Sequence, residues 1–288
     1  MLPDGSKPFL DVERGGRYGH TSPRGGIYWE DETYSDQSVL LALPKVFDPG
    51  KSAAMVVFLH GNNATLQRDV VDRQRVVAQF ERAGLNGVLV APQLAVDALD
   101  SSAGNFWTPG VFAKFVAEAA QRLATLSGLS ADLFDAMPIV IAAYSGGYNP
   151  AAYALSAGGV ERRVAGVILL DALFGEIPKF ARWVSANAAR SFFVSAYGES
   201  SAAGNKELMQ QLGGVDFTTG APRELSPGTV AFIKSHSAHD TFVTSAFVAN
   251  PVERLLRARK LDIEHQFVIA QFASGRRIPH NLRLVARI

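Results

Sequence analysis

A serine that follows a short apolar run is the first candidate for chemistry in this sequence. Residues 138–148 read P-I-V-I-A-A-Y-S-G-G-Y, which predicts a buried strand, then Ser145, then the start of a helix. A sharp turn between strand and helix exposes the serine hydroxyl and brings the residues two before and two after it close together. Ala143 and Gly147 hold those positions, and both are small enough to fit. The pattern predicts that Ser145 is a nucleophile.

A second segment with chemical potential is H-G-N-N at residues 60–63, which ends the apolar run Met55–His60. Together with A-Y-S-G-G it resembles the oxyanion loop and nucleophile elbow of the α/β-hydrolase family, and the resemblance covers about residues 26–260. It implies that the backbone amides of Asn62 and Gly146 form the oxyanion hole. The Gly146 amide also lies at a helix start, where the helix dipole favours negative charge. We expect His60 to hold the loop in place rather than to act as a base.

The acid is the least ordinary part of the pattern. Most members of the family carry it in a G-x-x-D segment after the strand that corresponds to Ser191–Tyr197, but residues 198–201 read G-E-S-S here. One strand earlier, Asp171 follows the apolar run Val164–Leu170, at the sheet edge where ligands bind, and some lipases of the family place their acid there. We predict Asp171 as the acid and keep Glu199 as the alternative. A helix-capping role is the non-catalytic interpretation of Asp171.

A general base must be one of six histidines, at positions 20, 60, 236, 239, 265 and 280. The family order of nucleophile, acid and base requires a histidine after the last strand, predicted at Thr229–Lys234. His236 and His239 meet that condition. We predict His239 as the base because an apolar run that can begin a helix follows it, and we keep His236 as the alternative.

The resemblance implies a cofactor-free serine hydrolase that cleaves a carboxylic ester through a Ser-His-Asp triad and an acyl-enzyme. The same triad directed at an amide or peptide bond is one alternative, and a non-catalytic binding module on the same scaffold is another. The substrate is expected to be a small-molecule ester or amide. We expect no metal and no nucleotide cofactor, since the chain has no cysteine, no H-E-x-x-H segment and no glycine-rich phosphate loop.

The elements that position these residues are short apolar runs alternating with helical patterns, which predict an α/β fold. We expect the α/β-hydrolase fold, with a mostly parallel eight-stranded sheet, helices on both faces and no large lid. Its antiparallel edge is expected from Gly26–Glu30 and Ser38–Val46. Residues 1–25 are expected to be a loose leader, residues 26–260 the hydrolase domain, and residues 261–288 an extension packed on it or trailing from it.

Aromatic residues near the predicted strand ends are candidates for an acyl or leaving-group pocket, although such residues also commonly pack in cores. They are Phe106, Trp107, Tyr144, Tyr148, Phe174 and Trp183. The loop over residues 94–109 is long for an α/β unit, and loops of that length are often functional.

Composition sets outer limits on function. The chain has 288 residues, is 48% hydrophobic and carries a formal net charge of +1, so it offers no basic surface for nucleic acid. No run approaches the ~20 apolar residues of a transmembrane helix. The N-terminus lacks the apolar core of a secretory signal, so the sequence as written predicts a cytoplasmic protein. Removal of a signal peptide would make it secreted or periplasmic. The sequence gives no indication of the oligomeric state.

Overall fold

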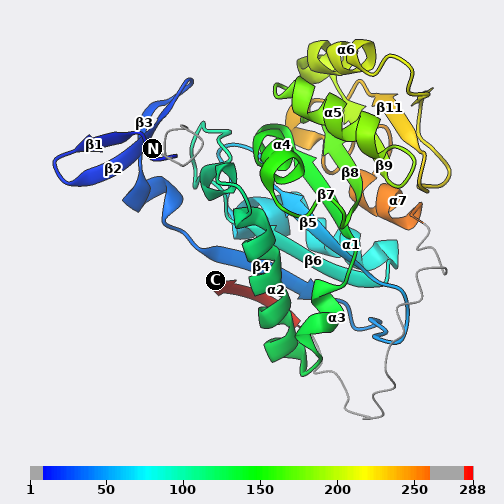
Figure 1. Ribbon diagram of the computed structural model, residues 1–288, viewed down its shortest axis with the longest axis horizontal. Coiled ribbons are helices and arrows are strands. Elements are labelled where there is room, and N and C mark those ends of the chain that lie inside the picture. Colours follow the sequence, from blue (N-terminus) through cyan, green and yellow to red (C-terminus); the bar gives the residue numbers. More distant parts are fainter. Residues whose placement is uncertain (1–8, 260–281, 288) are drawn as a thin grey trace.

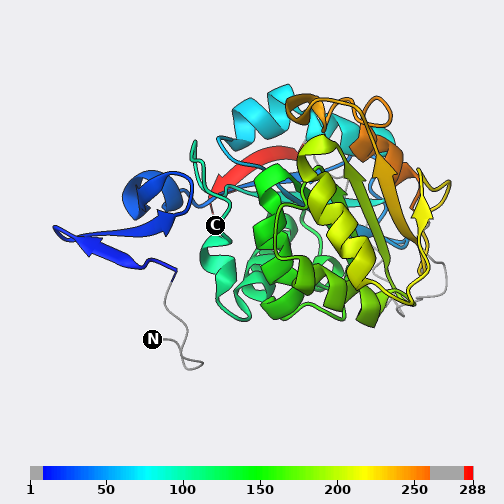
Figure 2. The same ribbon diagram turned by 90° about the horizontal axis from the view of Figure 1, so that it is seen from above.

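The central feature of the protein, described from a computed structural model, is a nine-stranded sheet with helices on both faces (Figures 1 and 2). The structure describes residues 9–259 and the backbone of residues 282–287. The sheet order is β10-β11-β9-β8-β7-β5-β6-β4-β12. The strands are β4 (Ser38–Leu43), β5 (Ala54–Leu59), β6 (Gly87–Pro92), β7 (Ile139–Tyr144), β8 (Val164–Leu170), β9 (Phe192–Tyr197), β10 (Thr218–Thr219), β11 (Val230–Lys234) and β12 (Leu282–Arg287).

Strand direction confirms the predicted mostly parallel sheet. Only β4 runs against its neighbours, because it pairs antiparallel with both β6 and β12, whereas the other pairs are parallel. Eight strands have five to seven residues, and the two-residue β10 adds a ninth at one edge. The carboxyl ends of β7, β8 and β11 therefore lie at the same edge of the sheet, where ligands bind in open α/β folds.

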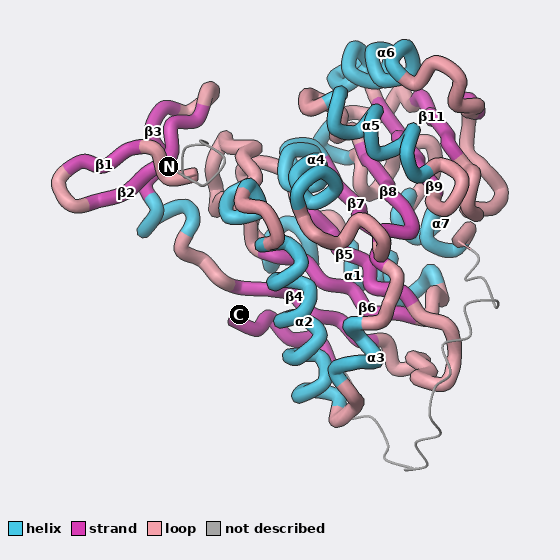
Figure 3. The backbone as a smooth tube through the Cα atoms, viewed as in Figure 1, coloured by secondary structure: helices cyan, strands magenta, loops and turns pink. Residues whose placement is uncertain are grey.

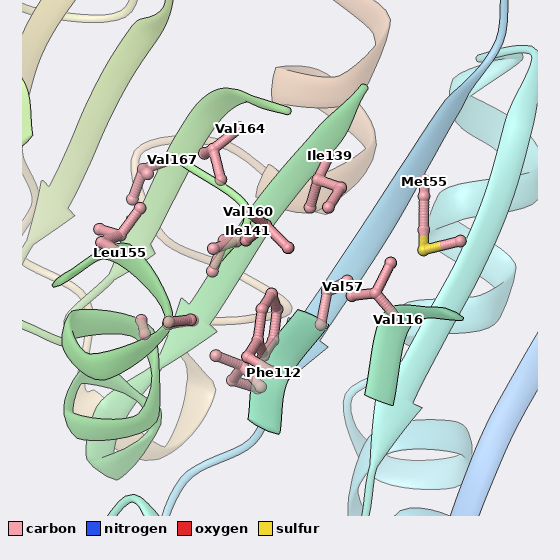
Figure 4. Packing of buried hydrophobic residues seen from close by; sticks show 14 of the residues in the cluster. Met55, Val57, Phe112, Val116, Ile139, Ile141, Leu155, Val160, Val164 and Val167 are labelled. Carbon is pink, nitrogen blue, oxygen red and sulfur yellow. The ribbon is translucent and has the colours of Figure 1, made fainter. Parts of the chain in front are cut away.

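Two apolar clusters, one on each face, hold the sheet between its helices. Every residue of β5, β6 and β7 is buried, which is why these strands appear in the sequence as continuous apolar runs. Alternation along β5 sends Met55 and Val57 to one cluster and Val56 and Phe58 to the other. Figure 4 shows Met55 and Val57 of β5 in the same cluster as side chains of β7 and β8 and as Phe112 and Val116 of α2.

The helices divide between the two faces according to these clusters. The first cluster includes residues of α2 (Val111–Ser127), α3 (Ala131–Asp135), α4 (Tyr148–Ala157), α5 (Ile177–Asn187) and α6 (Ala202–Gln211). The second includes residues of α1 (Val76–Ala83), α7 (Pro251–Arg257) and the helical turns Leu66–Arg73. Between β8 and β9 the chain forms only α5, which agrees with the expected lack of a large lid. No helix of the described part is long and apolar enough to cross a membrane.

The N-terminal region differs from the prediction. Within the expected loose leader, β1 (Val12–Arg14) and β2 (Arg17–Ser22) form strands, and β3 (Gly26–Trp29) joins them in a separate antiparallel sheet. Figures 1 and 2 show this N-terminal sheet standing at one side of the molecule. Residues 26–29 were expected at the edge of the central sheet, but β12 takes the place beside β4. The sequences of β1, β2 and β3 show no regular spacing of apolar residues, because most of their side chains are at least partly exposed.

Two further predictions need adjustment. The single helix expected over Leu66–Ala83 is interrupted, because Arg75 adopts a left-handed conformation with φ 54° and α1 starts only at Val76. The helix expected to reach residue 260 ends at Arg257. The apolar segment at residues 267–272, considered as an edge strand, lies outside the described residues. The long loop between β6 and α2 contains one short helical turn at Gly104–Trp107 (Figure 3).

Candidate active site

Ser145 lies in the tight turn between β7 and α4. Its φ of 51° is left-handed, a region that costs a non-glycine residue energy and that turns its side chain out of the strand path. Gly147 allows this turn because a Cβ there would come within 2.3 Å of the Leu59 carbonyl oxygen on β5. Ala143 is fully buried in β7. Ala143 and Gly147, the two small residues on either side of Ser145, therefore lie where a larger side chain would not fit.

His239 is the histidine that reaches Ser145. Its Nε2 lies 2.8 Å from the Ser145 Oγ, and its Nδ1 lies 2.6 Å from Oδ2 of Asp171. It belongs to a short helical turn after β11 (His239–Thr241). Tyr144 fixes it from the strand side, because the tyrosine ring stacks on the imidazole and its hydroxyl donates to the His239 carbonyl oxygen over 2.7 Å. The predicted nucleophile, base and acid thus form one hydrogen-bonded chain.

Asp171 is a fully buried carboxylate at the end of β8. Burial alone would raise its pKa, but hydrogen bonds from His239, from the hydroxyls of Ser200 and Ser201 and from the Gly198 amide lower the pKa to about 2. The side chain is therefore ionised at neutral pH and accepts the Nδ1 proton of His239. That tautomer leaves Nε2 free to accept a proton from Ser145.

A buried polar network supports the acid from behind. Ser201, which donates to Asp171, is linked to Asn205, whose side-chain amide donates to the Ser201 carbonyl oxygen over 2.9 Å. Ser195 of β9 donates in turn to the Asn205 side-chain oxygen over 2.5 Å. All three residues are buried. Sequence reasoning did not identify this network, although the serine in place of the usual acid, Ser201, was the available signal.

The alternative acid and base lie outside the hydrogen-bonded chain. Glu199 is exposed and pairs with Lys234 at 2.8 Å, an interaction that lowers the pKa of the glutamate. His236 is also exposed, three residues before His239. The imidazole that contacts Ser145 is therefore that of His239, and the carboxylate that contacts this imidazole is that of Asp171.

The predicted oxyanion loop passes directly beside the nucleophile. A Cβ on Gly61 would come within 2.7 Å of the Ser145 Cβ, so this position must lack a side chain. A Cβ on Gly146 would lie 2.0 Å from the side-chain oxygen of Asn62. Asn62 and Gly146, the two residues expected to supply amide donors, are thus adjacent to each other and to Ser145.

These elements together decide the fold. A serine in a left-handed turn follows β7, the central strand of a mostly parallel sheet, an aspartate follows β8, and a histidine follows β11. The chain has the α/β-hydrolase fold.

Comparisons with known proteins give structural likeness only. No protein-family model matches the chain, and no curated protein matches its sequence. Solved structures of similar fold include an uncharacterised protein from Capnocytophaga ochracea (13% identity, TM-score 0.48, 78% of this chain). Others are the S-formylglutathione hydrolase of Staphylococcus aureus (15%, 0.45, 77% of this chain and 88% of that one) and esterase 2 of Thermogutta terrifontis (13%, 0.46, 71% and 79%). The chain spans 62% of the Capnocytophaga protein.

His60 is buried beneath the predicted oxyanion loop. Its Nε2 accepts the Leu94 amide proton over 2.9 Å, so the ring proton is on Nδ1, which lies 2.7 Å from the Gly61 carbonyl oxygen. Burial lowers the pKa of His60 and keeps the ring neutral. His60 therefore joins the segment Gly61–Asn63 to the long loop after β6 through hydrogen bonds.

The aromatic residues considered for a pocket separate into two groups. Tyr148 packs on Phe174 at a ring distance of 6.2 Å, and Phe174 meets the His239 ring edge-on at 5.7 Å, so these two border the site. Trp107 stacks on Tyr153 at 5.0 Å. Tyr144 borders the site as well, because its ring stacks on His239, whereas Phe106 and Trp183 are buried in the core cluster. Among the residues that the structure describes, no three acidic or histidine side chains gather as a metal site would require.

Proposed function

We propose that this protein is a serine hydrolase that cleaves carboxylic esters without a cofactor. The observation that carries the proposal is the hydrogen-bonded chain from the Ser145 Oγ through His239 to the buried Asp171 carboxylate. It combines an activated nucleophile, a general base and a group that orients the base. Ser145, His239 and Asp171 lie at the carboxyl edge of the sheet, where a substrate can reach them.

The reaction would begin when His239 Nε2 takes the Ser145 proton as Oγ attacks the ester carbonyl carbon. The carbonyl oxygen becomes an oxyanion, and we assign the Asn62 and Gly146 amides as its donors. His239 then gives the proton to the departing alkoxide, and the acyl group stays on Ser145. A water molecule repeats the sequence on the acyl-enzyme, which releases the carboxylic acid and restores the serine. Asp171 remains ionised and stabilises the protonated imidazole.

The test of this proposal is covalent labelling. Intact-mass measurement after treatment with a fluorophosphonate should find one adduct on the wild type and none on Ser145→Ala. Turnover of nitrophenyl butyrate should show the same dependence on Ser145. A matched control is Ser185→Ala, a substitution on the exposed face of α5 that should leave labelling and turnover unchanged.

A folded wild type that takes no label and turns over no more ester than Ser145→Ala would refute the proposal. That result would favour a non-catalytic binding role for the scaffold. Labelling that persists on Ser145→Ala would place the reactive group elsewhere.

A further inference from the structure

The N-terminal sheet and the helical turn after it contact the loop segment Leu99–Ser102. Ser22 Oγ at the end of β2 donates to the Leu99 carbonyl oxygen over 3.3 Å, and the Leu99 amide donates to the Tyr28 hydroxyl of β3 over 3.1 Å. Tyr34, in the helical turn Glu30–Tyr34 after β3, donates to Oδ2 of Asp100 over 2.8 Å. The sheet bonds the backbone of Leu99, and the turn after the sheet bonds the side chain of Asp100.

Asp100 is the anchor of that contact. Its side chain is buried, and besides Tyr34 it accepts hydrogen bonds from the amide and the hydroxyl of Ser102. A buried carboxylate must be satisfied by such donors, so the backbone around it has little freedom. Ser101 lies between Asp100 and Ser102 and is fixed by both.

Ser101 connects the segment Leu99–Ser102 to the candidate oxyanion hole. Its hydroxyl donates to the side-chain oxygen of Asn62 over 3.0 Å, and that oxygen is the atom that a Cβ on Gly146 would meet at 2.0 Å. The same hydroxyl would lie 2.9 Å from a Cβ on Gly146. Ser101 therefore sits within contact distance of both residues that we assign as oxyanion donors.

A second contact reinforces the first. The amide of Asn63 donates to the Ala98 carbonyl oxygen over 2.9 Å, and Arg68 bonds both the Asn63 carbonyl oxygen and the Asp97 carboxylate at 2.6 Å. Asn63 and Asp97 both adopt left-handed backbones, with φ of 52° and 46°. The oxyanion loop and the segment after β6 therefore each turn sharply at the point where hydrogen bonds join them.

We propose that Ser101 is a positioning residue for the oxyanion hole, and that the turn after the N-terminal sheet holds it there through Tyr34 and Asp100. The role rests on the proposed hydrolase function. The Ser101 hydroxyl orients the Asn62 side chain against Gly146 and so restrains the Asn62 amide beside Ser145. Because amide donors stabilise the transition state only when they are held in place, loosening Asn62 lowers kcat and leaves ground-state binding nearly unchanged.

The test compares Ser101→Ala with Ser101→Thr, which keeps the hydroxyl, and with Ser35→Ala as a control in the N-terminal region. The Ser35 hydroxyl donates to the carbonyl oxygen of Asp31, away from the loop. We expect Ser101→Ala to lower kcat for nitrophenyl butyrate about tenfold, less than the loss of a whole donor, with KM within about twofold of wild type. Ser101→Thr should recover most of the activity, and Ser35→Ala should match wild type.

A transition-state analogue separates positioning from general stability. A trifluoromethyl ketone adds to the nucleophile and places an oxyanion in the hole, so its inhibition constant should rise in Ser101→Ala by the same factor as kcat/KM falls. Tyr34→Phe should cause a smaller change in the same direction. Tyr18→Phe, a substitution of an exposed tyrosine on the N-terminal sheet, should cause none.

Three outcomes would overturn the role of Ser101. If Ser101→Ala keeps wild-type kcat and inhibitor affinity, the hydroxyl does not position the hole. If it raises KM alone, or weakens the ketone less than it lowers kcat/KM, the loss lies outside the oxyanion. If the wild type is no more active than Ser145→Ala, the hydrolase proposal fails and the role of Ser101 fails with it.

Discussion

Replacement of Asp171 by asparagine is the sharpest single test of the site. The carboxylate accepts the Nδ1 proton of His239, and this holds the ring in the tautomer whose Nε2 faces Ser145 without a proton. An asparagine of the same shape can turn its NH₂ group toward Nδ1, which would move the ring proton to Nε2. His239 would then be unable to take the proton from Ser145.

The expected loss of activity in Asp171→Asn is large because His239 stays in place but can no longer accept the Ser145 proton. In serine hydrolases of this design such a change lowers kcat by about 1,000- to 10,000-fold. The variant should also lose about 2 kcal/mol in the free energy of unfolding, since the donors around the carboxylate would face a neutral amide. Steady-state turnover of nitrophenyl butyrate at pH 7 measures the first effect, and urea unfolding measures the second.

Glu199→Gln is the matched control. Glu199 is exposed and ion-paired with Lys234 on the surface, and such pairs contribute little, so this variant should keep its activity within about twofold. The assignment of the acid is wrong if Asp171→Asn retains activity within tenfold of wild type while Glu199→Gln loses it. Circular dichroism of both variants would establish that the comparison is between folded proteins.

Three further results are expected. Gly61→Ala should lower kcat roughly 100-fold, because its Cβ would displace Ser145, whereas Gly213→Ala, with open space around it, should be neutral; a neutral Gly61→Ala would contradict the close approach. Ser201→Ala should destabilise the protein by about 2 kcal/mol in urea unfolding, since it removes a hydrogen bond to a buried charge, and an unchanged midpoint would argue against that bond. The pKa of Asp171 falls from its ordinary value of 3.8 to about 2 on folding, so its stabilisation of about 2 kcal/mol is complete above about pH 5 and is lost as the pH falls toward 2. Between pH 2 and pH 5 the free energy of unfolding should therefore rise more steeply with pH for wild type than for Asp171→Asn. An equal dependence on pH in both proteins would contradict the depressed pKa.

The central sheet could be predicted from the sequence because its strands are buried on both faces. Runs such as Val164–Leu170 contain no polar residue, and the bounds of β8 match that run. Parallel strands bring their carboxyl ends to one edge, so polar residues directly after such runs were predicted to meet. Ser145, Asp171 and His239 do lie within hydrogen-bonding distance, and their catalytic roles remain predictions.

The N-terminal sheet could not be predicted in the same way. Its strands are short, carry glycine and charged residues, and pack mainly on one another, so no apolar period marks them. Its contact with Asp100 and Leu99 depends on single hydrogen bonds between segments about 70 residues apart in the sequence. The break at Arg75 escaped prediction for a related reason, because the apolar spacing of Leu66–Ala83 continues across it.

The left-handed residues have a consequence for attempts to improve this protein. Asn63, Ser145 and Asp171 each hold a backbone conformation that glycine would adopt at lower energy, by about 1 kcal/mol apiece. All three border the candidate site. At Asp171 the hydrogen bonds to the buried carboxylate offset that cost. At Ser145 a laboratory selection for heat resistance alone would favour glycine and would discard the nucleophile that the proposed chemistry needs. Directed evolution of this chain therefore has to select for turnover and thermal tolerance together.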